Sequence, residues 1–576
     1  MVYDTLIPNL DIVRRRYNPK TSMASDKAKA PENAGPSEEQ SMAEAEADVG
    51  GESGSESEAE VPATVSAESG PSRPSKKKKK RSKISRAISA LSGDTVPQAV
   101  VDRVVAKVKE EHGEDSPAAD EDAVRQLLKQ LKLRDVAEGK AGLGGKHKKD
   151  AGDHKFWATQ PVPHYGDSAP EEDGYIEPSK PREEVRQDPY PLPKDFEWSI
   201  LDITEPVQIK EVYELLSANY VEDDQAAFRF QYTAEFLEWA LKPPGWHKEW
   251  HIGVRVSSNR KLVAFISGVP IRLRVRKKDL SAVEINYLCV HKKLRSKRLA
   301  PVLIKEITRQ CHLKGIFQAI YTAGIVIPTP ISTCRYYHRT LNVPKLVDVK
   351  FTYVPRDMTI ARMVRQSKVP STPFLSRSGL REMEERDVSA VAELYRRYME
   401  RFDMVPLFEE EDIRHQFLSG RGTGEKEAST GRRTGQVVWT YVVENPETHA
   451  ITDFFSFYTL PSTIVAHPRH SLLQAAYLYY YASDTASEEN ADDLGLLKRR
   501  LTELVGDAII LADQAKFDVF NALTLMDNPL FLQELKFGSG DGLLNFYLYN
   551  WRSKALAGMN HTEDRTAGRG VGVVML

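Results

Sequence analysis

The sequence predicts an α+β fold made of two similar halves behind a long disordered tail. Alternating apolar runs at residues 250–256, 262–271 and 283–290 lead into a helical pattern and then a short strand at 318–322. The same order returns further along the chain, with strands and a helix expected at residues 437–443, 451–460, 475–482, 497–516 and 519–525. The repeated order of elements predicts the two similar halves, and the polar composition of the tail predicts its disorder.

We expect three parts: a tail over residues 1–150, a first half over 151–365 and a second half over 366–576. The tail is rich in Glu, Ser, Ala, Gly, Pro and Lys. Such a segment cannot bury enough apolar surface to offset the entropy lost on ordering, so we expect disorder.

The net charge of −2 conceals a segregation of charge within the tail. An acidic block at residues 38–60 precedes a basic run at 76–83, which begins with Lys76 and ends with Lys83. The basic run could bind RNA, anionic lipid or a nuclear import receptor, or could simply be solvated.

Cysteine usage and the lack of a signal peptide indicate a reduced, cytoplasmic protein, since the chain has three cysteines, an odd number. No apolar run reaches the roughly 20 residues that a transmembrane helix needs. We see no coiled-coil pattern and expect a monomer.

Residues 284–304 read as a strand, a basic loop and the start of a helix. Ile285, Tyr287 and Val290 favour a buried strand, and Pro301 suits a first helical turn. The loop between them carries five cations: Lys292, Lys293, Arg295, Lys297 and Arg298. A helix N-terminus offers unpaired N–H groups and a positive dipole end, so the pattern predicts a phosphate site. A solvated basic loop is the alternative.

Two other segments mix aromatic rings with polar groups. Residues 155–163 form an extended aromatic segment, either a ligand contact or a strap on the core. In residues 220–232, three carboxylates lie among four aromatic rings, which suits a cationic peptide. A solvated acidic turn or a metal site would be the alternatives, and the absence of nearby histidines disfavours metal.

Near the end of the sequence, three glycines bracket Asp541 and predict a tight turn, followed by a strand at residues 546–551. Residues 568–576 then combine three glycines with an apolar run. Terminal segments are usually polar and frayed, so this one is expected to be buried, and a buried strand that merely completes a sheet is the alternative to a functional role.

Cys289 is the strongest candidate nucleophile, because His291 lies two residues further along the same strand and therefore on the same face. A buried core cysteine is the simpler interpretation, and we favour it. No zinc-ligand spacing occurs, so we expect neither a metal nor a cofactor.

The loop at residues 295–300 is similar to the acyl-CoA loop of the GNAT acetyltransferases, Arg/Gln-x-x-Gly-x-Gly/Ala, through Arg295, Arg298 and Ala300. Arg298 replaces the central glycine. Residues 284–304 as a whole resemble the signature of the eukaryotic, fungal-type N-myristoyltransferase family nearly residue for residue. Further matches follow in the family's order at residues 155–163, 220–232, 243–246, 331–339 and 536–542.

This resemblance implies a GNAT-like fold in both halves and transfer of myristate from myristoyl-CoA, a substrate, to the N-terminal glycine of proteins. It implies acyl-CoA contacts from Lys155, Phe156, Trp157, Ala158, Tyr287, Leu288, Cys289, Val290, Arg295, Ser296, Lys297, Arg298, Leu299 and Ala300. It implies peptide contacts from Tyr220, Glu222, Asp223, Asp224, Phe228, Phe230, Asn286, Thr322, Tyr336, His338 and Asp541. The second half lacks a basic loop and should not bind CoA.

The resemblance also implies a mechanism without a side-chain nucleophile. The backbone N–H groups of Tyr287 and Leu288 would form an oxyanion hole, which requires a bulge to free them from the sheet. The α-carboxylate of Leu576 would accept the proton of the glycine ammonium. An ordered mechanism, with acyl-CoA bound before peptide, is expected. An N-acetyltransferase of the same superfamily and a non-catalytic ribosome or RNA adaptor remain alternatives.

Overall fold

The computed structural model describes residues 155–576, except 165–166, 168–169, 222–226, 328, 466 and 560–566. The tail, with its acidic and basic blocks, lies outside the described residues. Within the described part, no helix combines the length and the apolar character required to cross a bilayer.

The elements of the first half follow the predicted order, with bounds that differ by a few residues. They are β1 (Phe196–Ile200), α4 (Pro206–Asn219), β2 (Phe228–Phe230), α5 (Ala234–Leu241), β3 (His251–Val256), β4 (Leu262–Val275), β5 (Lys278–Val290), α6 (Leu299–Leu313), β6 (Gln318–Ala323), β7 (Ser332–Thr340), α7 (Val343–Asp348) and α8 (Ile360–Ser367).

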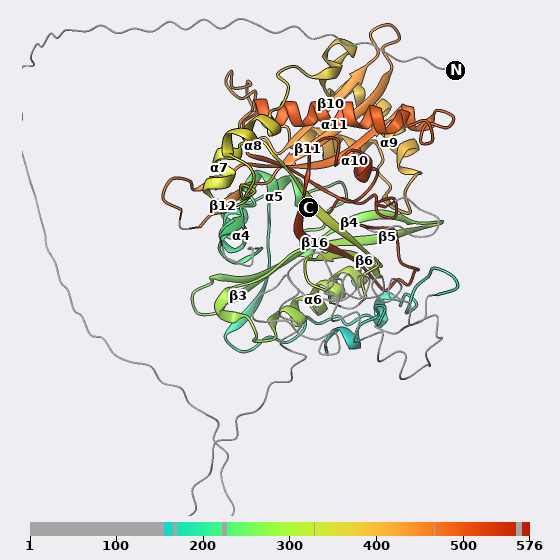
Figure 1. The fold of residues 1–576 in the computed structure, drawn as a ribbon. Helices are drawn as coiled ribbons and strands as arrows, with labels where there is room; N and C mark the ends of the chain where they lie inside the picture. The colour runs from blue at the N-terminus through green and yellow to red at the C-terminus, as the bar shows by residue number, and fades with distance from the viewer. Residues whose placement is uncertain are drawn as a thin grey trace, which may run out of the picture. The chain divides into compact units, whose positions relative to one another are not determined.

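The second half repeats much of this order. Its elements are β8 (Leu380–Glu382), α9 (Val388–Met399), β9 (Met404–Pro406), α10 (Glu410–Arg414), β10 (Val438–Glu444), β11 (Ile451–Thr459), β12 (Ser462–Ile464), β13 (Leu472–Leu473), β14 (Ala475–Ser483), α11 (Leu496–Gln514), β15 (Val519–Leu523) and β16 (Gly538–Tyr549). Figure 1 shows the green first half and the orange second half joined by strands between them.

A 13-stranded sheet runs through both halves in the order β1-β3-β4-β5-β6-β16-β7-β15-β14-β11-β10-β8, with β9 paired to β4. In each half one parallel pair is bridged by a helix: β5 and β6 by α6, and β14 and β15 by α11. A parallel pair needs such a crossover, whereas the neighbouring antiparallel strands need only turns. The α+β prediction and the architectural repeat are confirmed.

Strands β16 and β7 are exchanged between the halves. β16, from the second half of the sequence, pairs with β6, while β7, from the first, pairs with β15; the two also pair with each other. Each half is therefore completed by a strand of the other. The boundary between residues 365 and 366 stays a prediction.

Helix α6 begins at Leu299, two residues earlier than predicted, so Pro301 lies within its first turn, where its missing N–H costs no hydrogen bond. The helix ends before Gly315, whose φ of 80° is the left-handed conformation of a helix stop. Its buried face, which includes Leu303 and Ile307, packs in one core cluster with Trp250 and Val283.

The tight turn predicted around Asp541 is wrong. Residues 538–549 form one strand, β16, whose pairing with β7 shifts register between Ser539 and Leu543. The glycines allow β16 and β7 to approach closely and do not form a turn, since a Cβ on Gly540 would lie 2.4 Å from Nε2 of His338.

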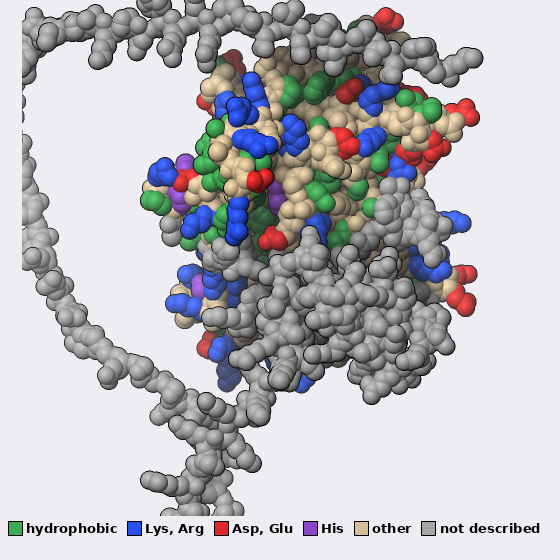
Figure 2. All heavy atoms as spheres, in the orientation of Figure 1, with side chains coloured by type: hydrophobic (Ala, Val, Ile, Leu, Met, Phe, Trp, Pro, Cys, Tyr) green, Lys and Arg blue, Asp and Glu red, His purple; other side chains and the backbone are tan. Residues whose placement is uncertain are grey.

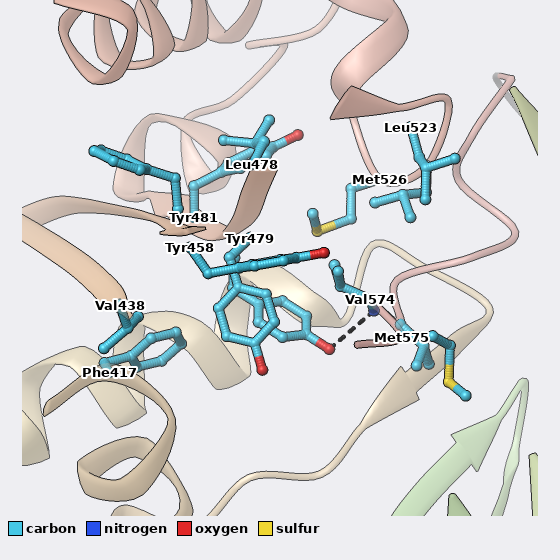
Figure 3. Packing of buried hydrophobic residues seen from close by; sticks show 14 of the residues in the cluster. Phe417, Val438, Tyr458, Leu478, Tyr479, Tyr481, Leu523, Met526, Val574 and Met575 are labelled. Carbon is cyan, nitrogen blue, oxygen red and sulfur yellow. Dashed lines mark hydrogen bonds between the residues drawn. The ribbon is translucent and has the colours of Figure 1, made fainter. Parts of the chain in front are cut away.

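The core of the second half is dense in tyrosine. Tyr479, Tyr480 and Tyr481 are consecutive on β14 and all are buried. Figure 3 shows Tyr479 and Tyr481 among Phe417, Tyr458 and Met526, with Val574 and Met575 of the final segment beside them.

The surface of the described part carries charges of both signs. On the face drawn in Figure 2, basic side chains gather over α7 and α8, and acidic ones lie toward the opposite edge. Arg362 and Arg365 of α8 are both exposed.

Candidate functional site

A cavity of about 510 Å³ lies where the halves meet. Its walls come from β5, α6, β6, β7, β14 and β16, and from Leu576. One part of its lining is strongly apolar and is formed by Ile266, Ile285, Ile304, Ile307, Cys311, Ile316 and Phe317. An apolar recess beside a few polar groups is typical of a site for a small amphipathic ligand.

The wall formed by β5 contains a bulge. Phe265 pairs with Cys289 and Ser267 with Asn286, so Tyr287 and Leu288 together face one residue of β4. Tyr287 has a φ of 56°, which is uncommon for a residue other than glycine and marks strain that the surrounding sheet must hold. The irregularity required for a backbone oxyanion hole is therefore present, and both residues line the cavity.

The hydroxyl of Tyr220 lies at this bulge. It accepts a hydrogen bond from the backbone N–H of Tyr287, while burial raises the pKa of the phenol far above its ordinary value. Tyr220, Tyr232 and Tyr287 pack as a ring cluster, with centroids 5.2–6.1 Å apart. The phenol thus stays neutral and satisfies a strand donor that the bulge has freed.

The basic loop leads from the bulge to the N-terminus of α6. Arg298, the residue preceding α6, has a φ of 59° and its side chain does not cap the helix. Ser296, Lys297 and Arg298 are exposed, whereas Leu299 is buried and anchors the helix. The geometry leaves the first N–H groups of α6 directed to a surface that carries positive charge.

The aromatic segment at residues 155–163 reaches the cavity through Trp157. Its ring stacks on Tyr321 at 5.4 Å, and Tyr321 stacks in turn on Tyr547 at 5.1 Å. Phe156 packs edge-on against Trp157, while Lys155 and Ala158 are exposed. Of the four residues predicted in this segment, Trp157 lines the cavity.

The residues predicted to hold a peptide divide into two groups. Tyr220, Phe230, Asn286, Thr322 and Tyr336 line the cavity. The other described residues of the set lie outside the lining: Phe228 packs against Phe351, His338 is hydrogen-bonded to Asn521 at 2.7 Å, and Asp541 is exposed. Glu222, Asp223 and Asp224 lie outside the described residues.

Cys289 does not pair with His291. Its side chain is buried toward α4, with Sγ 4.0 Å from the carbonyl oxygen of Leu215, and burial raises the pKa of the thiol to about 12. His291 instead accepts a hydrogen bond from the backbone N–H of Lys293. Cys289 is a core residue, and neither its side chain nor Val290 lines the cavity.

The final segment runs through the core to the cavity. Val571, Val573, Val574 and Met575 are buried, and Met575 and Leu576 line the cavity. Residues 572–576 form no strand, so the segment does not simply complete the sheet. The hydroxyl of Tyr480 accepts a hydrogen bond from the Val574 N–H at 3.0 Å, drawn as a dashed line in Figure 3.

The anchor of this segment lies at Arg569. Its guanidinium donates to Asp527 at 2.6 Å and to Asp492 at 3.0 Å, and Arg401 contacts the same two carboxylates. Asp527 is fully buried, so these paired charges fix the place where the segment enters the core.

Several residues at the site are not among those predicted from the sequence. Tyr458 and Tyr477 line the cavity, and Glu284 accepts a hydrogen bond from Asn286 at 2.6 Å. Glu284 also accepts one from the Leu576 N–H, and burial raises its pKa to about 7. Its place in the strand just before the bulge was the available signal.

The comparisons with known proteins agree with this geometry. Residues 175–334 match the family described as myristoyl-CoA:protein N-myristoyltransferase, N-terminal domain, and residues 348–574 match its C-terminal domain. Glycylpeptide N-tetradecanoyltransferase from Emericella nidulans is 51% identical over 464 residues, which cover 79% of this chain and 90% of that protein. Glycylpeptide N-tetradecanoyltransferase 1 from Arabidopsis thaliana is 50% identical over 410 residues, which cover 70% of this chain and 87% of that protein.

Among solved structures, the crystal structure of Saccharomyces cerevisiae N-myristoyltransferase with bound myristoyl-CoA has a TM-score of 0.68 and 48% identity. It covers 74% of this chain and 99% of that one. The family models, the curated relatives and the solved structure each match more than half of this chain. This chain belongs to the N-myristoyltransferase family.

Proposed function

We propose that this chain transfers myristate from myristoyl-CoA to the N-terminal glycine amine of proteins, by direct attack through a tetrahedral intermediate. One observation carries the mechanism: a single cavity brings the bulge of β5, an apolar recess and Leu576 together. Membership of the family supports the reaction, and the geometry supports the roles given below.

The acyl chain occupies the apolar recess beside α6, where removal of its methylene groups from water supplies much of the binding free energy. The phosphates of CoA lie against residues 295–300 and the N-terminus of α6. Trp157 covers the thioester end of the donor.

The peptide enters from the side of Phe230, Thr322 and Tyr336. Its N-terminal amine, with an ordinary pKa of about 8, is mostly protonated at neutral pH and cannot attack. The carboxylate of Leu576 takes one proton, and the freed lone pair attacks the thioester carbonyl. The N–H groups of Tyr287 and Leu288 stabilise the oxyanion, which requires that Tyr287 release the hydroxyl of Tyr220.

Collapse of the intermediate breaks the C–S bond, and the CoA thiolate takes a second proton from the new amide nitrogen. Acyl-CoA binds first because the donor completes the wall against which the peptide docks. Beyond the glycine, the carboxylates of Glu222, Asp223 and Asp224 attract cationic residues of the peptide.

We also propose that the enzyme acts in the cytoplasm as a monomer and that the basic run from Lys76 to Lys83 contacts ribosomal RNA. This arrangement would bring the enzyme to nascent chains at the moment when the N-terminal glycine becomes available.

The test is a transfer assay with the full chain, myristoyl-CoA and a peptide that begins with glycine, read by mass spectrometry. The matched control peptide begins with alanine. We expect a myristoyl group on the glycine peptide alone. Transfer of an acetyl group from acetyl-CoA in preference would favour the N-acetyltransferase, and absence of any transfer would favour the adaptor.

A further inference from the structure

A second cavity, of about 380 Å³, also reaches Leu576. We call it the acidic cavity, because Glu409, Glu411 and Asp412 of the α10 region line it. Glu284 and Leu576 also line it, and Leu576 lines the substrate cavity as well. Leu576 and Ile316 are therefore shared by the linings of the two cavities.

The stoichiometry of the reaction requires a route for a proton. An ammonium and a thioester become an amide and a thiol, so one proton is released to solvent in each turnover. At that moment the acyl chain and the peptide fill the substrate cavity. The acidic cavity, whose lining also includes Leu576, offers that proton a route that the substrates do not occupy.

Glu284 is the carboxylate placed to receive that proton. It lies on β5 two residues before Asn286 and therefore on the same face of the strand, and Asn286 donates to its Oε1 at 2.6 Å. The Leu576 N–H donates to the same carboxylate. These two hydrogen bonds hold Glu284 beside the final residue and at the wall of the acidic cavity.

We propose that Glu284 relays the glycine proton: the proton passes from the ammonium to the Leu576 carboxylate, then to the Glu284 carboxylate through water in the acidic cavity, and finally to solvent. No bond other than O–H and N–H bonds is made or broken in the relay. This inference rests on the proposed function of the chain. It makes Glu284 a proton-relay residue that acts through Leu576.

The surroundings of Glu284 suit a group that must both accept and release a proton. Burial raises its pKa to about 7, so that it exchanges protons readily near neutral pH. The titratable and charged groups around it come from several elements: Tyr287 on β5, Arg272 on β4, Tyr479 and Tyr480 on β14, Glu409, Glu411 and Asp412 near α10, and the carboxylate of Leu576.

Most of these neighbours do not compete for the proton. Burial raises the pKa of the three tyrosines far above 10, so they stay neutral. Burial also raises the pKa of Asp412, whereas Glu409 and Glu411 are exposed and are the later acceptors of the proton.

The experiment measures kcat, the KM for peptide and the pH dependence of kcat between pH 5.5 and 8.5 for the full chain with myristoyl-CoA. Because the relay works when Glu284 is ionised, wild-type kcat should rise through a pKa near 7. Glu284→Gln should lower kcat about tenfold, leave KM within about twofold and remove that rise. Glu284→Asp should recover part of kcat together with the pH dependence.

Asp279→Asn is the matched control, since it removes one carboxylate from an exposed position on the same strand. Ser281→Phe is a second variant, which narrows the acidic cavity while Glu284 remains, and should also lower kcat. An unchanged kcat and pH profile in Glu284→Gln would overturn the relay, as would a raised KM with the wild-type pH profile. A wild-type enzyme that transfers no myristate would instead overturn the proposed function.

Discussion

At the scale of single residues, the stack of Trp157, Tyr321 and Tyr547 joins the aromatic segment to β6 and β16. Offset stacks of this kind contribute about 0.5–1.5 kcal/mol beyond their buried area. We therefore expect Trp157→Ala to raise the KM for myristoyl-CoA roughly five- to tenfold. Trp157→Phe should keep most of the affinity, and steady-state kinetics at saturating peptide measures both.

An unchanged KM in Trp157→Ala would show that this segment is only a strap on the core. A fall in melting temperature without a kinetic effect would lead to the same conclusion.

The sequence could indicate some of the site residues better than others. The bulge at Tyr287 could be predicted, because the resemblance implies an oxyanion hole on this strand. Such a hole needs backbone N–H groups that are not paired within the sheet. For Glu284, three residues earlier, the place just before the bulge was the available signal, but it could not reveal the hydrogen bond from the Leu576 N–H. Contacts between residues far apart in sequence decide such an environment.

At the scale of the elements, the final segment depends on glycines for its path through the core. A Cβ on Gly570 would lie 2.2 Å from the backbone nitrogen of Ala557, which cannot move away as a flexible side chain could. Gly570→Ala should therefore displace Leu576 and lower kcat at least tenfold, and cost about 1–3 kcal/mol of stability.

Gly174→Ala is the control for this substitution, because a Cβ there meets nothing within 4 Å. The melting temperature and kcat are measured for both variants, Gly570→Ala and Gly174→Ala. Wild-type kcat in Gly570→Ala would mean that the reaction does not need the final residue in place.

The junction of β8 and α9 predicts a dependence of stability on pH. Asp387 is buried, accepts from both terminal nitrogens of Arg381 at 2.7 Å and closes a capping box with Glu384. The ion pair and the hydrogen bonds outweigh burial and hold its pKa below the ordinary 3.8. Its ionised form thus stabilises the fold above that value, and the contribution is lost as the pH falls through the lowered pKa.

We expect Asp387→Asn to cost roughly 2 kcal/mol at pH 7, where the charged hydrogen bonds are present. The difference from wild type should narrow as the pH falls below about 4. Urea unfolding at a series of pH values measures the difference in unfolding free energy between the variant and wild type. Asp493→Asn, a substitution at an exposed position, is the control. A difference that stays constant down to pH 3 would contradict this assignment.

At the element scale, the sequence predicted long strands and helices well, because their apolar period is local. The region around Asp541 was misread as a turn. Its glycines leave room for Tyr336 and His338 on β7, a strand some two hundred residues earlier in the sequence. No local sequence pattern reveals such a contact.

At the scale of the whole molecule, we expect the tail to be dispensable for chemistry. A chain that lacks residues 1–154 should keep kcat within about twofold in solution, since the cavity is built by described residues beyond them. Association with ribosomes, followed by cosedimentation, should fall. Loss of transfer in solution would mean that the tail has a part in the reaction itself.

The exchange of β16 and β7 also bears on how the protein is made. β16 pairs with β6 and β7 in the middle of the sheet, although it follows them by much of the sequence. Contacts between such distant residues slow folding, and during synthesis β6 has no partner for one edge until β16 has left the ribosome. The first half of this enzyme therefore emerges with an open sheet edge, and a chaperone that shields strand edges should associate with the nascent chain until the last strand is inserted.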